Sequence, residues 1–265
     1  MNTVKIDLCG LPDELRSGLE KLCMHEGFRS GTDGIRLSAR RGGAFSAEFD
    51  GQTLRVEYCE PVQFFRALSY LKRADHRRFA LHRQPVFEHN GVMLDCSRNA
   101  VPRVEAVKMV LRKMALMGLN TLMLYTEDTY EVPEQPYFGY LRGRYSVEAL
   151  RGLDSYAAAL GIELVPCIQT LAHLNCIFKW DVYEEVHDVN DILLLREEKT
   201  YALLEDMFAT VADAFTSRRI NIGMDEAHMV GLGKFLDRNG VQDRYTILLE
   251  HLGRVLELCR KYGFR

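Results

Sequence analysis

Two adjacent carboxylates, Asp225 and Glu226, follow a short apolar run in the stretch INIGMDEAHM, residues 220–229. Most Asp-Glu pairs in a chain with 37 acidic residues belong to solvated loops. This pair differs because Ile-Asn-Ile is typical of an interior strand, and α/β sheets and barrels place their chemistry where such strands end. Paired carboxylates at a strand end can transfer protons and stabilise positive charge, so the pattern favours an active site here.

Three other apolar runs also end in side chains that transfer protons or form strong hydrogen bonds. They are Asp95, Ser97, Arg98 and Asn99 after GVMLDCS, Tyr125, Glu127 and Asp128 in NTLMLYTED, and Gln169, Thr170, His173 and Asn175 after IELVPCIQTLAH; His228 follows the fourth run. Any one of these has a structural explanation, since an arginine often caps or pairs and a histidine is often buried and satisfied. Four consecutive strand ends of this kind predict side chains that converge on one rim.

Helical patterns separate the four runs. One apolar stripe begins after Pro102 and ends at Gly118, and another begins at Ser146, a residue suited to cap a helix, and ends at Gly161. Helices are also predicted over residues 199–217 and 241–262. Strand–helix alternation repeated four times predicts an α/β fold built from parallel β/α units.

Residues 1–88 have a different pattern of apolar and polar residues and are predicted to form a small α+β domain. A strand in TVKIDL precedes a helix, and GIRLSARR, AFSAEFDG and QTLRVEYCE alternate apolar and polar residues as an antiparallel meander would. A helix beginning at Pro61 closes this domain. Residues 82–90 are expected to connect it to a second domain, residues 89–265.

The composition argues against several classes of protein. A net charge of −3 provides no basic surface for nucleic acid, and no apolar run approaches the roughly 18 residues that a membrane span needs. The N-terminus lacks the apolar core of a signal peptide, so a cytoplasmic protein is expected. Seven scattered cysteines without C-x-x-C pairs indicate reduced thiols rather than disulfides or a zinc site. No metal or other cofactor is expected.

Four stretches together resemble glycoside hydrolase family 20, the β-N-acetylhexosaminidases, and especially its bacterial exo-β-N-acetylglucosaminidases. They are GVMLDCSRN, NTLMLYTEDTYE, ELVPCIQTLAHL and INIGMDEAHMVGLGKFL, of which Gly-x-Asp-Glu is the most specific. The resemblance covers residues 91–265, and residues 1–88 resemble the family's small N-terminal domain. It implies a (β/α)8 TIM barrel, of which residues 89–265 would hold the first four β/α units.

The resemblance also implies a mechanism and a substrate, a glycan with a terminal N-acetylhexosamine. This family departs from the usual pair of glycosidase carboxylates because the 2-acetamido oxygen of the sugar is the nucleophile. By resemblance, Glu226 is the general acid and then the general base. Asp225 orients the acetamido group and stabilises its developing positive charge.

Further roles follow from the resemblance at matching positions. Arg98 matches the arginine that binds sugar hydroxyls, and His173 matches the histidine that supports the acid. Glu127 and Asp128 stand where the family usually has Asp-Asp after a strand with a histidine, which LYTED lacks. His228 is assigned either to the sugar site or to a structural role. The single tryptophan, Trp180, is assigned either to the pocket or, more often for such a residue, to loop packing.

The chain has room for only four of the eight strands of a barrel, which usually needs about 250 residues. We therefore interpret it as a fragment whose partner is the other half of the barrel or a second copy of itself, and we expect the isolated chain to lack activity. Two alternatives remain open. One is a non-catalytic carbohydrate-binding or scaffold remnant, and the other is a metal-dependent hydrolase that uses His173, Asp225 and His228.

Overall fold

The structure is a computed structural model that describes residues 3–98 and 100–265, so the prediction for Asn99 lies outside the described residues. The chain divides into two compact units. The first extends through Val92 and includes Arg103–Leu122 and Ser155–Glu163. The second comprises Met93–Pro102, Met123–Asp154 and Leu164–Arg265. The domain boundary expected after residue 88 stays a prediction.

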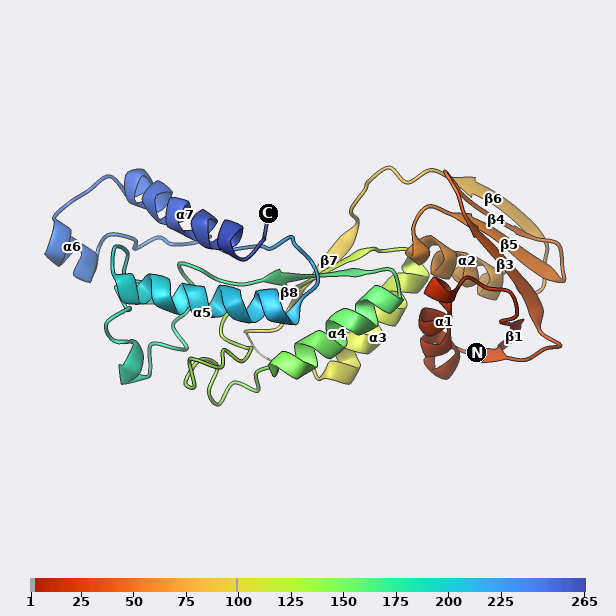
Figure 1. Cartoon of the computed structure of the whole chain (residues 1–265), viewed down its shortest axis with the longest axis horizontal. Helices are drawn as coiled ribbons and strands as arrows, with labels where there is room; N and C mark the ends of the chain where they lie inside the picture. The colour runs from red at the N-terminus through yellow and green to blue at the C-terminus, as the bar shows by residue number, and fades with distance from the viewer. Residues whose placement is uncertain (1–2, 99) are drawn as a thin grey trace. The chain divides into compact units, whose positions relative to one another are not determined.

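The first unit contains a six-stranded mixed sheet with the order β2-β1-β3-β5-β4-β6 (Figure 1). Its strands are β1 (Val4–Asp7), β2 (Phe28–Ser30), β3 (Ile35–Arg41), β4 (Phe45–Phe49), β5 (Thr53–Tyr58) and β6 (Phe79–Arg83). The predicted antiparallel meander is wrong in one respect, because β3 pairs with β5 in parallel while β4 lies beyond β5. Alternation sets which face of a strand is buried but not which strand lies beside it. Strands β2 and β6 were not predicted.

One face of this sheet forms the core of the first unit. Leu37, Phe49, Leu54, Val56 and Tyr58 are all buried, at alternating positions of β3, β4 and β5. The helices α1 (Asp13–His25) and α2 (Pro61–Ala74) cover this face (Figure 1). The predicted start of α2 at Pro61 is confirmed, and a reciprocal capping box between the flanking Glu60 and Gln63 fixes it.

The second sheet has three strands in the order β7-β8-β9. They are β7 (Gly91–Asp95), β8 (Thr121–Tyr125) and β9 (Glu163–Cys167). A backbone hydrogen bond joins Asn120 to Asn90 before the first two strands, and another joins Cys96 to Tyr125 after them. Starts pair with starts and ends with ends, so the strands are parallel as predicted.

The predicted fourth strand is reduced to one parallel bridge between Asn221 and Cys167. The amides of Ile168 and Thr170 donate to the carbonyls of Asn221 and Gly223, so the segment follows the edge of β9 without forming a full ladder. Two features explain why the predicted fourth strand does not form. Gly223 adopts a left-handed φ of 51°, and in the described chain no strand pairs with the far side of this segment.

Helices separate these strands as predicted. They are α3 (Val104–Met117), α4 (Val147–Ala159), α5 (Glu198–Ala214) and α7 (Arg244–Lys261), and the short helices η1 (Asp181–Tyr183) and α6 (Lys234–Asn239) were not predicted. The hydroxyl of Ser146 accepts a hydrogen bond from the amide of Ala149, which confirms its capping role. Gly118 ends α3 in a left-handed conformation. Among the described residues, no helix is both long and apolar enough to cross a lipid bilayer.

Candidate active site

The C-terminal ends of the parallel strands meet at a cavity of about 620 Å³ in the second unit. This volume lies within the usual range for a small-molecule site. Its lining residues come from the ends of β7 and β8 and from the loops after β8 and β9: Arg98, Glu127, Arg142, His173, Asn175, Cys176, Asn190 and Asp191. Three of the residues predicted for the site, Arg98, Glu127 and His173, are thus brought together.

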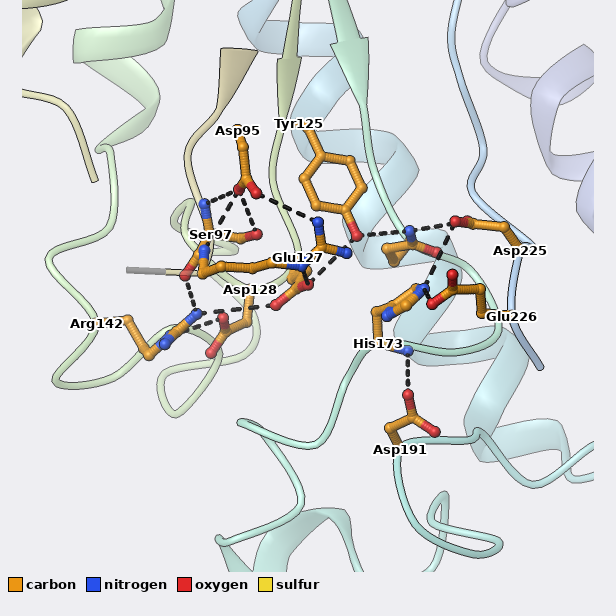
Figure 2. A network of polar contacts seen from close by, with 12 residues as sticks. Asp95, Ser97, Tyr125, Glu127, Asp128, Arg142, His173, Asp191, Asp225 and Glu226 are labelled. Carbon is orange, nitrogen blue, oxygen red and sulfur yellow. Dashed lines mark hydrogen bonds and ion pairs between the residues drawn. The ribbon is translucent and has the colours of Figure 1, made fainter. Parts of the chain in front are cut away.

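Asp225 and Glu226 both approach the ring of His173 (Figure 2). The Nε2 atom of His173 lies 3.6 Å from Asp225 Oδ2 and 3.7 Å from Glu226 Oε2. Both distances exceed a hydrogen bond, and this buried nitrogen has no hydrogen-bond partner in the described structure. The ring of His173 therefore lies near both carboxylates and is hydrogen-bonded to neither.

Asp225 is held in place by Gln169. The Gln169 Nε2 atom donates to Asp225 Oδ1 at 3.1 Å and to the Tyr125 hydroxyl at 3.0 Å. Tyr125 in turn donates to Glu127 Oε1 at 3.3 Å. Gln169 is therefore the donor to both Asp225 and Tyr125, and Tyr125 is the donor to Glu127. Burial raises the pKa of Asp225, but the hydrogen bond from Gln169 and the nearby His173 outweigh it and lower the pKa below its ordinary value.

The backbone two residues before the carboxylate pair requires a glycine, Gly223. A Cβ atom at this position would lie 2.3 Å from the Ile168 carbonyl and 2.5 Å from Gln169 Oε1. Its left-handed φ of 51° would also disfavour any residue with a side chain. The glycine thus allows the segment to pass directly against the end of β9, where Gln169 reaches Asp225.

Two of the central residues have an uncommon backbone conformation. Glu226 has a φ of 54° and His173 a φ of 60°, both left-handed. The amide of His173 donates to Asp191 Oδ2 at 3.0 Å, and the carbonyl of Glu226 accepts from the amide of His228. Such conformations persist where surrounding contacts enforce them, and they concentrate at functional sites.

Arg98 lines the cavity together with Glu127 and His173. Its guanidinium contacts Asp95 at 3.3 Å and Glu127 at 3.9 Å and packs over the Tyr125 ring. Asp95 also accepts hydrogen bonds from the amide and hydroxyl of Ser97, which fixes the turn after β7. Burial raises the pKa of Asp95, but these hydrogen bonds outweigh it and lower the pKa.

Arg142 joins the ends of β7 and β8, and sequence reasoning missed it. It donates to Asp128 at 3.0 Å and to the carbonyl of Ser97 at 2.6 Å, and it lies 3.9 Å from Glu127 (Figure 2). Asp128 is thereby committed to this ion pair and is almost fully buried, so it does not line the cavity. The signal was the long polar-aromatic loop after β8, since loops that follow barrel strands supply site residues.

Glu127 is a buried carboxylate at the base of this network. Burial raises its pKa, and the hydrogen bond from Tyr125 and the charge of Arg98 offset only part of that rise. Its two oxygens face different partners, Tyr125 and Arg98 on one side and Arg142 on the other.

Two residues considered from the sequence lie apart from this network. His228 is exposed, and no side-chain contact joins it to the carboxylates in the described chain. Trp180 does not line the cavity but packs against Tyr137 and Tyr140. Among the described residues, no three His, Cys, Asp or Glu side chains are arranged to hold a metal ion.

The sequence profile of the catalytic domain of glycosyl hydrolase family 20 matches residues 87–247. The chain belongs to this family. A β-hexosaminidase of Vibrio furnissii is 26% identical over 229 residues, covering 69% of this chain and 37% of the relative. Human hexosaminidase D is also 26% identical, covering 56% of this chain and 31% of the relative. The chain thus spans about a third of the length of these family 20 relatives.

Solved structures of family 20 enzymes share the fold. The exo β-N-acetylglucosaminidase of Vibrio harveyi, in complex with N-acetylglucosamine, superimposes with a TM-score of 0.81 at 18% identity. The match covers the whole of this chain and 50% of that protein. A β-N-acetylhexosaminidase of Streptomyces coelicolor gives a TM-score of 0.77 at 19% identity, covering 99% of this chain and 60% of that protein. The predicted family and the α/β fold of a partial TIM barrel are confirmed.

Proposed function

We propose that this chain carries the catalytic carboxylates of an exo-acting glycosidase that removes terminal β-linked N-acetylglucosamine or N-acetylgalactosamine from glycans. The observation that carries the proposal is the approach of Asp225 and Glu226 to one ring nitrogen of His173, within 3.7 Å, beside the cavity. Membership of family 20 supports it. The relatives from Vibrio furnissii and Vibrio harveyi are a β-hexosaminidase and an exo β-N-acetylglucosaminidase.

The proposed reaction uses the substrate's own acetamido group. Its oxygen attacks the anomeric carbon while Glu226 gives a proton to the departing glycosidic oxygen, and the bond between that oxygen and the anomeric carbon breaks. The products of this step are an oxazolinium ion and a free alcohol. Water then attacks the anomeric carbon, Glu226 takes a proton from it, and the oxazolinium ring opens to the free sugar.

The surroundings of the two carboxylates suit these separate roles. The lowered pKa of Asp225 keeps it ionised, as a group that stabilises the positive oxazolinium must be. Gln169 fixes its direction by the hydrogen bond at 3.1 Å. Arg98 and Glu127, which line the cavity with His173, are proposed to bind the sugar hydroxyls.

The isolated chain is expected to lack activity, so a direct test uses this chain completed by the second half of a family 20 barrel. It compares hydrolysis of 4-nitrophenyl N-acetyl-β-glucosaminide and 4-nitrophenyl β-glucoside. Only the first has the acetamido nucleophile, so only the first should be cleaved. With a disaccharide, whose leaving group is poor, Glu226→Gln should reduce turnover by about 10²- to 10⁴-fold through loss of acid–base catalysis. Equal rates on the two nitrophenyl substrates, or near-normal disaccharide turnover by Glu226→Gln, would contradict the mechanism.

A second candidate is a carbohydrate-binding protein without turnover. The Asp225 and Glu226 side chains are 62% and 66% exposed, and water around a carboxylate weakens the electrostatic effects on which catalysis depends. Binding of N-acetylglucosamine without any release of nitrophenol would favour this candidate. The same nitrophenyl assay therefore separates the two functions.

A further inference from the structure

Three aromatic side chains, Tyr137, Tyr140 and Trp180, contact one another on the surface of the second unit. The ring centroids of the two tyrosines are 5.8 Å apart, and each lies 5.4 Å from Trp180. The tyrosines are 44% and 45% exposed, and the adjacent Leu141 is 78% exposed. We call Tyr137, Tyr140 and Trp180 the aromatic cluster. Contiguous exposed apolar patches of this kind mark binding surfaces more often than single exposed residues do.

The aromatic cluster is carried by the same two loops that line the cavity. Tyr137 and Tyr140 lie in the loop that also contains Arg142, and Trp180 lies in the loop that also contains Cys176. Both Arg142 and Cys176 line the cavity. Tyr140 is two residues from Arg142 in the first loop, and Trp180 is four residues from Cys176 in the second.

The polar atoms of the aromatic cluster have no partners within the described chain. Neither tyrosine hydroxyl makes a hydrogen bond there, and Trp180 Nε1 is buried without one. Buried polar groups of native proteins are nearly always paired, and aromatic residues with a free polar end are typical of binding surfaces. The Lys179 ammonium lies 5.1 Å from the Trp180 ring centroid and occupies one face of that ring. The rings of Tyr137 and Tyr140 are therefore more accessible to a ligand.

We propose that the aromatic cluster is a second sugar-binding site. It takes a unit of a β-linked N-acetylhexosamine oligosaccharide that lies beyond the terminal unit. A pyranose ring has one apolar face of C–H groups, which packs on an aromatic face, and hydroxyls at its rim, which match the free tyrosine hydroxyls. This inference rests on the proposed function, because the choice of a glycan follows from the chemistry assigned to the cavity.

Trp180 is the only tryptophan in the chain, so intrinsic tryptophan fluorescence reports on the aromatic cluster alone. The 265-residue chain would be titrated with N-acetylglucosamine and with its β-1,4-linked di-, tri- and tetrasaccharides. We expect a saturable change in emission with the oligosaccharides and a dissociation constant at least about 5-fold lower for the trisaccharide than for the monosaccharide, as one or two stacking contacts provide.

Variants test which side chains are responsible. Tyr137→Ala and Tyr140→Ala should each weaken trisaccharide binding by about 2- to 10-fold, the range of one aromatic contact. Tyr140→Phe retains the ring and should keep most of the affinity. The matched control is Tyr245→Ala on α7, an exposed tyrosine outside the aromatic cluster, which should leave binding unchanged.

A second measurement separates this inference from the proposed function. The ring resonances of His173, followed by NMR in the same samples, report N-acetylglucosamine in the cavity. A His173 response without any Trp180 response to the oligosaccharides overturns the second site and leaves the proposed function standing. A Trp180 response that both alanine variants retain in full also overturns it. A Trp180 response that the variants weaken, without a His173 response, supports the second site and contradicts the proposed function, and silence of both probes contradicts both.

Discussion

Single side chains at the strand ends determine what the site can do. Gln169 offers two N–H groups, and both are used, one for Asp225 and one for Tyr125. A glutamate of the same shape at this position would have no donor when ionised, and it would place a second negative charge beside Asp225. The choice of an amide therefore keeps Asp225 ionised and fixed in direction.

The first prediction concerns this amide. Gln169→Glu should raise the pKa of the Asp225 carboxyl, measured by ¹³C NMR titration. In this chain completed by the second half of a family 20 barrel, it should also lower kcat/KM on an N-acetylglucosaminide by about 10-fold. That size follows from the lower end of the roughly 1.5–3 kcal/mol of a hydrogen bond to a charged group, because the Asp225 side chain is 62% exposed. Gln135→Glu is the matched control, because Gln135 also donates to an aspartate, Asp206, but does not line the cavity. An unchanged Asp225 titration in the Gln169 variant would show that the amide does not hold this carboxylate.

The second prediction concerns the buried carboxylate of Glu127. Its pKa is raised in the folded chain, so the folded state disfavours the ionised form. This destabilisation is full above the folded pKa and disappears below the unfolded value, near 4.3. Glu127→Gln should therefore melt at a higher temperature than the parent at pH 7–8, and the difference should close as the pH falls toward about 4.

Differential scanning calorimetry across pH 4–8 would measure this difference. Glu134→Gln, at an exposed position, is the control and should show no pH-dependent gain. A Glu127→Gln variant that is less stable at every pH would mean that its contacts with Arg98 and Arg142 outweigh the burial of its charge. A gain in stability with loss of sugar binding would be the usual sign that a functional residue is held at the expense of stability.

Helix α7 is joined to the end of β9 by a buried histidine. His251 Nε2 lies 2.8 Å from the Thr170 carbonyl, and Nδ1 lies 3.2 Å from the Tyr201 hydroxyl of α5. The carbonyl can only accept, so Nε2 carries the proton and the neutral ring accepts from Tyr201 at Nδ1. Thr170 follows Gln169, so this contact of α7 and α5 supports the strand end that positions Asp225.

The third prediction concerns the pH dependence of this contact. Burial lowers the pKa of His251, and the positive charge of Arg254 acts in the same direction, against the hydrogen bond to Thr170. The unfolded chain therefore binds a proton below about pH 6.5 that the folded chain does not. Stability should fall as the pH drops from 6.5 toward the folded pKa, with a slope of at most about 1.4 kcal/mol per pH unit from this residue.

Urea unfolding between pH 8 and pH 5 would measure that slope. His251→Gln keeps a donor for Thr170 but cannot titrate, so its stability should be lower at pH 8 and should depend less on pH. His82→Gln, at an exposed position on β6, should retain the slope of the parent. Equal slopes for the parent and His251→Gln would assign the pH dependence to other groups.

At the scale of the whole molecule, the parallel sheet has two edges without a neighbouring strand in the described chain. One is β7 and the other is the Asn221 segment beside β9. Strand β7 is apolar yet largely exposed, with Met93 at 51%. Unpaired backbone groups on an apolar edge strand are a template for association with another chain.

The fourth prediction is that the 265-residue chain associates as its concentration rises. Sedimentation velocity should show a shift from monomer to larger species, and Met93→Lys should weaken the shift because a charged edge residue opposes strand pairing. Met109→Lys is the control, since Met109 is an exposed methionine of a helix, α3, and not of an edge strand. A chain that stays monomeric at all concentrations and melts cooperatively would contradict the prediction.

The order and type of most elements, and the family of the chain, could be predicted from the amino-acid sequence. Apolar periodicity is a local property, so α3, α4, α5 and α7 were predicted to within a few residues at each end. Gly-x-Asp-Glu was identifiable because its residues are contiguous in the chain. The pairing of β3 with β5 was not predicted, because a period of two residues carries no information about neighbours.

Which side chains contact one another could not be predicted in this way, because it depends on the folded chain. The tertiary structure placed Gln169 against Asp225 and committed Asp128 to Arg142, contacts between residues 56 and 14 positions apart in the chain. It also assigned Trp180 to an exposed cluster with Tyr137 and Tyr140 rather than to the cavity. Hydrogen bonds and ion pairs act over a few ångströms, so their partners are set by how the loops after β8 and β9 fold back, and no spacing along the sequence encodes that distance.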